Sequence, residues 1–424
     1  MVSVIRNGRI IDPANSRDEI ADLYFDQGQI LNSKAAAKLT VERKIDASGL
    51  IVCPGLIDLN AKIGELNSKG HLTIFSEHRA ALNGGITTVC IQPNTIPVID
   101  EPAMAHMIRE SVKQQESIRV VPLGALTMGL HGESLTNMAS LKNAGCVGVS
   151  NARVPIHSTL LMRRAMQYAA TFDLTVFIHS QDPWLTGNGC VHEGEMSTRL
   201  GLSAIPEAAE TVAVARDLAL VSTTGVRAHF NQLSCARSVD MIAESKARGL
   251  NISADVAIHN LHLTEFDIQG FNTLCHVMPP LRQESDMIGL REGVNNGTIQ
   301  VICSDHQPCS KDNKLAPFIQ TVPGISGLET LLPLTLKLVD DAGLSLQQAI
   351  ACLTCNPAKT LGLSLGTLSE GAPADICIFD PNESWEFDPD EMLSNGKNNP
   401  FGGMKMRGRV AHTIIGGVVA TDLI

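Results

Sequence analysis

Eight short runs rich in β-branched and other apolar residues alternate with helical stretches between residues 51 and 360. Their ranges are 56–62, 87–94, 119–126, 145–150, 174–181, 226–234, 250–259 and 299–308. Strands that alternate with helices form parallel sheets, and eight such units close a (β/α)8 barrel. A hydrophobic fraction of 44 % with only 4 % aromatic residues suits a buried parallel sheet covered by helices. The sequence therefore predicts an α/β fold with a (β/α)8 TIM barrel over residues 51–360.

The two ends of the chain have a different pattern. Residues 1–50 contain short alternating strands separated by turn sequences such as DPANS, and turn-rich strands return after residue 361. We therefore expect 1–50 and 361–424 to form one composite small β-domain beside the barrel. The polar, Gly- and Asn-rich stretch 382–403 is predicted to be a loop.

Charge and cysteine content limit the possible environments. The net charge of −11 argues against nucleic-acid and anionic-membrane partners, and no apolar run approaches the ~18 residues of a membrane span. The start of the chain alternates like a strand, unlike a signal peptide. The eleven cysteines are scattered, apart from the pairs Cys303/Cys309 and Cys352/Cys355, so we expect free thiols in a reducing, cytoplasmic compartment. Cys352 and Cys355 lie in a helix-like run and are predicted to be small buried thiols.

Ten motifs occur along the chain in an order typical of one family. They are NGRIIDP, PGLIDL, QPNT, IHSQD, LSCARS, MPPLR, SDHQP, GISGLET, SEGAPADICIFD and RGRVAHTIIGG. In these motifs the chain resembles dihydroorotases of the amidohydrolase superfamily. The resemblance implies a barrel of the amidohydrolase type, with a site at the carboxyl ends of the strands.

The resemblance also implies one or two zinc ions. Their ligands would be a His-x-His pair after strand 1, a bridging carboxylate after strand 4, histidines after strands 5 and 6, and an aspartate after strand 8 that also acts as general base. The matching residues here are Asn60, Lys62, Asn151, His179, Gln232 and Asp305. A catalytic zinc needs three protein ligands of the right type, and an ammonium group repels a dication. Because only His179 and Asp305 keep the expected types, we expect no metal, no cofactor and no catalysis.

The substrate contacts that the resemblance implies are degenerate as well. They fall on Gly64, Asn94, Met278 and Cys309. Only Asn94 is retained, and the glycine stands where an arginine would bind a carboxylate. We therefore expect the pocket to bind dihydroorotate poorly.

Other residues near the predicted strand ends have simpler interpretations. His229, His259 and His276 are predicted to be hydrogen-bonded core histidines rather than replacement ligands. Cys303 and Cys309 flank the end of the last strand, but their spacing matches no standard metal motif.

Two classes of function remain open. The first is a non-catalytic dihydroorotase homologue with a structural role in pyrimidine biosynthesis. The resemblance is closest to inactive homologues that support the catalytic chain of bacterial aspartate carbamoyltransferase, which implies that chain as partner and a homo-oligomer within a larger complex. The second is an amidohydrolase with a reduced or relocated metal site that acts on another cyclic amide. A metal-free ligand sensor is a third idea, which the lost arginine and Met278 disfavour.

The charge of Asp305 needs a partner if no metal is bound. In a closed barrel the last and first strands are neighbours, and an uncompensated buried carboxylate is costly. The sequence therefore predicts that Lys62 pairs with Asp305, and that Asn60, Asn151 or His179 completes a hydrogen-bonded plug.

Overall fold

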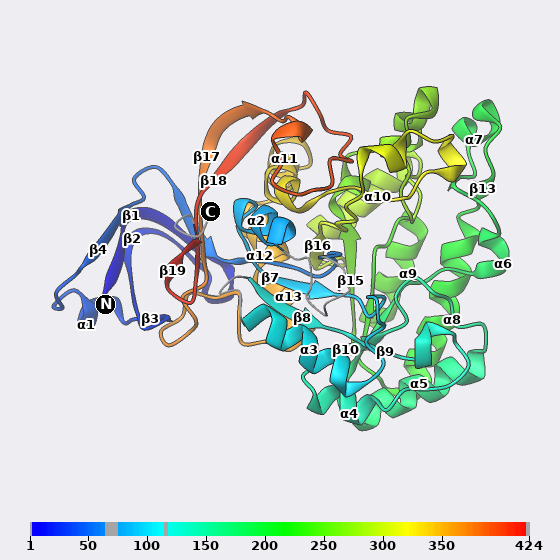
Figure 1. The fold of residues 1–424 in the computed structure, drawn as a ribbon, viewed down its shortest axis with the longest axis horizontal. Helices are drawn as coiled ribbons and strands as arrows, with labels where there is room; N and C mark the ends of the chain where they lie inside the picture. The colour runs from blue at the N-terminus through cyan, green and yellow to red at the C-terminus, as the bar shows by residue number, and fades with distance from the viewer. Residues whose placement is uncertain (1, 64–74, 114–117, 421–424) are drawn as a thin grey trace.

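A closed barrel of parallel strands forms the centre of the molecule, as the sequence predicts. The computed structural model describes residues 2–63, 75–113 and 118–420 (Figure 1). The barrel strands are β6 (Leu56–Asp58), β7 (Ile86–Ile91), β8 (Arg119–Pro122) continued by β9 (Gly124–Ala125), β10 (Gly148–Ser150), β11 (Thr175–Ile178), β14 (Ala228–Phe230), β15 (Ile252–Ala257) and β16 (Val301–Cys303). Each of the eight predicted runs overlaps one of these strands. The observed strands are shorter, because several predicted runs continue into loops at the mouth of the barrel.

Parallel pairing runs around the barrel in chain order. The two paths are β6-β7-β8 and β9-β10-β11-β14-β15-β16, and the Leu123 amide, between β8 and β9, donates to Ile91 O at 3.0 Å. A parallel bridge between Ala61 and His306 joins the last strand to the first. The barrel is therefore closed, and residues that follow β16 and β6 lie side by side.

Helices follow the strands and cover the outside of the barrel (Figure 1). They are α2 (Phe75–Asn83), α3 (Pro102–Lys113), α4 (Met138–Asn143), α5 (Thr159–Thr171), α8 (Ala208–Thr224), α9 (Ala236–Ala247), α10 (Glu284–Asn295), α11 (Leu331–Asp341), α12 (Leu346–Leu353) and α13 (Cys355–Leu361). Local sequence fixes their ends: Ser158 caps α5 by accepting from Leu161 N, and Gly225 ends α8 in a left-handed conformation. After β11 the chain makes an excursion through α6 (Pro183–Thr186), β12 (Val191–His192), α7 (Glu195–Leu200) and β13 (Ala204–Ile205).

Both ends of the chain contribute to one separate sheet, at the left of Figure 1. Its strands are β1 (Ser3–Asp12), β2 (Arg17–Asp26), β3 (Gln29–Ile30), β4 (Arg43–Asp46), β5 (Ile51–Pro54), β17 (Ile376–Glu386), β18 (Lys405–Ile415) and β19 (Val418–Val419), and a short helix α1 (Ser33–Ala36) follows β3. Strand β5 joins the two ends by pairing with both β1 and β17. The expected sheet from the two chain ends is confirmed, and the exact domain limits stay a prediction.

The predicted loop 382–403 begins later than expected. Residues 382–386 continue β17 because Trp385 pairs with Met406 of β18 and its indole Nε1 donates to Gly408 O at 3.1 Å. The rest of the stretch crosses to the barrel mouth, where Asn398 Nδ2 donates to Gly324 O at 2.9 Å.

The eleven cysteines are free thiols. Cys352 is buried in α12, whereas Cys355 is half-buried at the start of α13, so a helix break separates the pair. No helix within the described ranges is long and apolar enough to cross a membrane.

Candidate functional site: a closed barrel mouth

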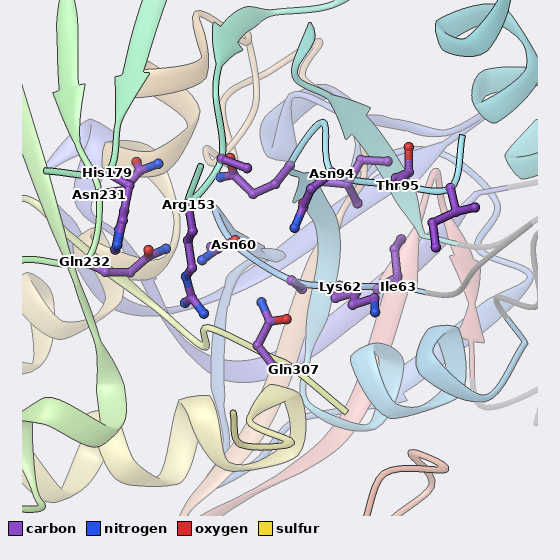
Figure 2. Close-up of a pocket in the computed structure, with 15 residues that line it drawn as sticks. Asn60, Lys62, Ile63, Asn94, Thr95, Arg153, His179, Asn231, Gln232 and Gln307 are labelled. Atoms are coloured by element: carbon purple, nitrogen blue, oxygen red, sulfur yellow. The ribbon is translucent and has the colours of Figure 1, made fainter. Parts of the chain in front are cut away.

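A pocket opens at the carboxyl ends of the barrel strands, as expected for this fold. Five of the residues singled out in the sequence line it, and Figure 2 labels them: Asn60, Lys62, Asn94, His179 and Gln232. Asp305 lies buried against the pocket, in contact with one of its lining residues, Arg153. Asn151, Met278 and Cys309 are not part of the pocket lining, and Gly64 lies outside the described residues.

Asp305 is held by a guanidinium and a carboxamide. Nη2 of Arg153 donates to both carboxylate oxygens of Asp305, at 2.6 and 2.7 Å, and Nδ2 of Asn60 donates to Oδ1 at 2.8 Å. The Asp305 side chain is 2 % exposed and that of Arg153 is 26 % exposed. Burial raises the pKa of Asp305 to about 6, against the opposing effect of Arg153. At neutral pH the carboxylate is therefore ionised and paired.

Arg153 reaches Asp305 because of a tight turn after β10. Ala152 has a φ of 50°, and Val154 N donates to Asn151 O at 3.1 Å across the turn. Asn151 braces this turn with its side chain, because its Nδ2 donates to Val154 O at 2.8 Å and its Oδ1 accepts from Thr127 Oγ1 at 2.7 Å. The carboxamide at the former bridging position thus orients Arg153 and does not reach Asp305.

Lys62 does not occupy the place that the sequence predicted. The cation beside Asp305 is Arg153, whereas the Lys62 side chain is exposed. Strand β6 ends at Asp58, and the backbone of Lys62 instead bonds His306 O at 2.9 Å, beyond the end of the barrel. Figure 2 shows Arg153 extending into the middle of the pocket and Lys62 at its side. The printed side-chain partners of Asp305 are Arg153 and Asn60, so the direct pair between Lys62 and Asp305 is not formed. Arg153 is the residue that sequence reasoning missed.

Two neutral histidines lie near Arg153. Burial and the guanidinium lower the pKa of His179 to about 3, and the same two causes lower that of His259 to about 3. His179 Nε2 contacts Gln181 Oε1 at 3.2 Å. Both ring nitrogens of His259 are buried without a hydrogen-bond partner among the described residues, so the prediction of a hydrogen-bonded core histidine is wrong there. His259 follows β15 in a 3-10 turn (Ile258–Leu261) whose four residues are all buried.

The other predicted core histidines are hydrogen-bonded. His229 bonds Ser253 Oγ at 2.7 Å and Asp255 Oδ2 at 2.9 Å inside the barrel, and His276 bonds Thr321 Oγ1 at 2.8 Å. Cys303 is fully buried and contacts the carboxylate of Asp255. These residues belong to the packed interior and take no part in the pocket.

The remaining degenerate positions have structural contacts. The backbone amide of Gln232 donates to Asp255 Oδ1 at 2.6 Å, in a left-handed conformation with a φ of 48°. Met278 Sδ contacts Gln181 Nε2 at 3.7 Å, and the Cys309 amide donates to Asn398 Oδ1 at 2.9 Å.

This donor set does not fit a catalytic zinc. Zinc sites use histidine, carboxylate or thiolate ligands, and only His179 and Asp305 among the former metal positions have these types. Asp305 already accepts three hydrogen bonds from Arg153 and Asn60. Among the described residues no group of three or more His, Cys, Asp or Glu side chains is arranged to hold a metal. A zinc ion would have to displace the guanidinium while the permanent positive charge of Arg153 opposed it.

The closed barrel, the sheet from both chain ends and the pocket at the mouth define a protein of the amidohydrolase barrel class. A family model described as dihydro-orotase-like matches residues 49–238, and one described as amidohydrolase family matches residues 276–421. A dihydroorotase-like protein of Pseudomonas aeruginosa is 44 % identical over 424 residues, with 98 % of this chain and 99 % of the relative covered. The chain therefore belongs to the dihydroorotase-like family of the amidohydrolase superfamily.

One more relative and one solved structure are similar to this chain over nearly its whole length. A protein named dihydroorotase from Syntrophotalea carbinolica is 42 % identical and covered over the whole length of both chains. The solved L-hydantoinase of Arthrobacter aurescens superposes with a TM-score of 0.87, with 99 % of this chain and 95 % of that chain covered. At 24 % identity the second similarity concerns the fold alone.

Proposed function

We propose that this chain is a catalytically inactive dihydroorotase homologue with a structural role in pyrimidine biosynthesis. The observation that carries the proposal is the contact between Arg153 and Asp305. The aspartate at this position would serve the family as metal ligand and general base, and here both of its oxygens accept from a guanidinium. A carboxylate held in this way cannot accept a proton from a metal-bound water.

The loss of chemistry is tested by assaying the isolated chain in both directions, with dihydroorotate and with carbamoyl-aspartate. The assays are run with and without added zinc, and an active dihydroorotase measured in parallel shows that the conditions are adequate. We expect no turnover above the uncatalysed rate. Turnover that depends on added zinc and on Asp305 would contradict the proposal.

The partner in this proposal is the catalytic chain of aspartate carbamoyltransferase, which this chain would support in a larger cytoplasmic assembly. What supports it is the combination of an intact barrel with a dismantled site, since the fold and its surface are kept where the chemistry is not. The partner itself comes from the resemblance of the sequence.

Deletion of the gene is then expected to impair formation of carbamoyl-aspartate while another enzyme performs the dihydroorotate step. A carbamoyltransferase purified from the deletion strain should also have a lower mass than the enzyme from the parent. Complementation with a His179→Ala variant should restore both, because assembly does not use the site. Unchanged carbamoyltransferase activity and mass without this chain would refute the partnership.

A second candidate function is an amidohydrolase with a reduced metal site that acts on another cyclic amide. The name dihydroorotase given to the full-length relative at 42 % identity favours it. Such an enzyme would need His179 and Asp305 as ligands, so His179→Ala should abolish both its activity and its metal content. Within the inactive homologue the same variant changes neither property.

A further inference from the structure

Trp184 is the most exposed of the large apolar side chains that the structure describes, at 83 %. It lies on α6 with Leu185, and three more exposed apolar side chains lie on α5, on α8 and in the turn before α5. The set, called the Trp184 face below, consists of Val154, Leu160, Trp184, Leu185 and Val212. Figure 1 shows α5, α6 and α8 next to one another at the right of the molecule. Exposed apolar patches of this kind mark interaction sites, whereas single exposed apolar residues do not.

Contacts between the three helices make the Trp184 face continuous. The Trp184 ring meets the His157 ring edge-on, with centroids 5.9 Å apart. His157 lies three residues after Val154 and three before Leu160, so this contact joins α6 to the start of α5. Both α5 and α6 also pack on α8.

Local hydrogen bonds fix the direction of Trp184. The carboxylate of Asp182 caps α6 by accepting from Trp184 N at 3.0 Å and from Leu185 N at 2.9 Å. The Asp182 amide donates to Ala209 O at 2.7 Å, which ties α6 to α8. Gly187 ends α6 with a φ of 51°, a conformation that glycine adopts readily. An exposed ring on a fixed backbone has a lower entropic cost of docking than one on a mobile loop.

The outward side of α8 lacks the charges that a solvent-exposed helix normally carries. Between residues 208 and 224 the charged side chains are Glu210, Arg216 and Asp217. Glu210 and Asp217 are buried, and the half-buried Arg216 contacts the Asp217 carboxylate at 2.8 Å. The exposed positions of α8 are Ala208, Val212, Ala215, Ala219, Ser222 and Thr223. Depletion of charge is typical of the core of a protein interface, so this side of α8 suits contact with protein.

Two adjacent arginines border the Trp184 face on α5. Arg163 and Arg164 are exposed one turn after Leu160, and neither has an ion-pair partner among the described residues. Two exposed carboxylates lie at other borders of the face, Glu207 directly before α8 and Glu133 in the loop after β9. The α5 side of the face is therefore positive, in a chain whose net charge is −11.

Further exposed charges belong to a neighbouring element. Glu193, Glu195 and Arg199 lie in or next to α7, which packs on the 3-10 turn Glu265–Phe271. They follow the Trp184 face in the chain and are not part of it.

An acidic surface with an apolar recess fits this combination of groups. Carboxylates opposite Arg163 and Arg164 would steer docking and set its orientation, and the recess would take the Trp184 ring. Tryptophan and arginine are the residues that most often dominate binding energy. A second copy of this chain would bring the same two unpaired arginines instead of the carboxylates that they need.

We propose that the Trp184 face docks a different protein, through a surface of that protein that is acidic around an apolar recess. This inference rests on the proposed function, in which that protein is the catalytic chain of aspartate carbamoyltransferase. It adds the surface of this chain at which the contact forms.

The test is calorimetric titration of the purified full-length chain with the purified carbamoyltransferase catalytic chain, at about 50 and about 500 mM salt. Trp184→Ala should raise the dissociation constant at least about tenfold at both salt concentrations. Arg163→Glu combined with Arg164→Glu should do the same at low salt and have a smaller effect at high salt, because salt screens exposed charges.

Matched controls change the same residue types elsewhere. Ile20→Ala removes a side chain that is 76 % exposed on β2. Arg237→Glu combined with Arg248→Glu reverses two exposed arginines on α9 and at its carboxyl end. Both controls should leave the dissociation constant within about twofold, and the thermal midpoint of every variant shows whether it is folded.

A second readout follows Trp184 directly. The chain has two tryptophans, Trp184 and Trp385, so labelling with 5-fluorotryptophan gives two ¹⁹F resonances, which a Trp184→Phe variant assigns. Docking should shift or broaden the Trp184 resonance. Trp385 is half-buried on β17 and serves as the internal reference.

The outcomes separate this inference from the proposed function. If the two chains bind but Trp184→Ala binds like the wild type and the Trp184 resonance is unchanged, the inference is wrong and the proposed function stands. If the wild-type chains do not bind, the partnership and the inference both fail. If Trp184→Ala lowers the mass of this chain alone in sedimentation and leaves binding to the carbamoyltransferase chain unchanged, the face joins copies of this chain and the inference is wrong.

Discussion

Arg153 donates from one guanidinium nitrogen to both oxygens of Asp305, at 2.6 and 2.7 Å, across the mouth of the barrel. The two residues are 152 positions apart in the chain and meet because the turn after β10 faces the end of β16. The contact supplies the positive charge that a buried carboxylate needs. In this chain the contact between Arg153 and Asp305 lies where the resemblance implies a metal.

Removing the guanidinium should destabilise the chain. Arg153→Ala leaves Asp305 buried without its cation, and breaking a buried pair in this way costs about 3 kcal/mol or more of the free energy of unfolding. The measurement is urea denaturation at pH 8, where Asp305, with a pKa of about 6, is ionised. Arg164→Ala is the control because Arg164 is exposed on α5; it should change the free energy by less than about 0.5 kcal/mol. A loss below about 1 kcal/mol for Arg153→Ala would show that the pair is not important.

Lys62 should show no energetic coupling to Asp305. The sequence alone predicted such coupling, but Arg153 is the cation that contacts the carboxylate. In double-mutant cycles with Asp305→Ala, we expect a coupling energy of about 2 kcal/mol or more for Arg153→Ala and less than about 0.5 kcal/mol for Lys62→Ala. A larger coupling for Lys62 would restore the original prediction.

Restoring two histidines should restore zinc binding only when the guanidinium is also removed. Asn60→His with Lys62→His adds two imidazoles to His179 and Asp305, which completes a set of four possible ligands. With Arg153 in place the positive charge still opposes the metal, so we expect no zinc. The triple variant that also carries Arg153→Ala should bind about one equivalent. Binding of zinc by the double variant would mean that Arg153 does not exclude the metal.

Acid should destabilise the folded chain through its neutral histidines. His179 and His259 have pKa values of about 3 when folded, but titrate near 6.5 when unfolded. Below pH 6.5 the unfolded state therefore binds more protons, and the free energy of unfolding falls by up to about 1.4 kcal/mol per pH unit for each histidine. Asp305 has the opposite effect on the free energy of unfolding. Its folded-state pKa is about 6, above its ordinary value, so between these two pH values the folded state binds the extra proton and the chain gains stability as the pH falls.

This pH dependence is measured by urea denaturation between pH 5 and 8. His259→Leu should reduce the slope of the free energy of unfolding against pH, below pH 6.5, by the contribution of one histidine, up to about 1.4 kcal/mol per pH unit. His106→Leu is the control, since His106 is exposed on α3. Equal slopes for the wild type and His259→Leu would show that His259 is protonated in the folded chain.

The sequence predicted the fold in more detail than the site. Each barrel strand overlaps a predicted run because the alternation of apolar strands and helices is a local signal along the chain. Asn60 lies beside Asp305 as predicted, since residues after the first and last strands meet in any closed barrel.

The position of Arg153 was harder to predict. Its direction depends on a left-handed φ at Ala152 and on the bracing of that turn by Asn151, and no motif marks either feature. The sequence did contain a signal for Arg153. A buried carboxylate without a metal requires a cation, and Arg153 lies two residues after the former ligand position Asn151. Lys62 was preferred because the first strand was predicted to reach residue 62, whereas β6 ends at Asp58.

The central claim is that a guanidinium stands where the family would hold a metal. Its most direct test is elemental analysis of wild-type protein expressed and purified with zinc present, followed by removal of loosely bound ions. The account predicts less than about a tenth of an equivalent of zinc, since even the loss of outer-shell support weakens a metal site 10- to 100-fold. Stoichiometric zinc that is lost in Asp305→Asn would contradict it.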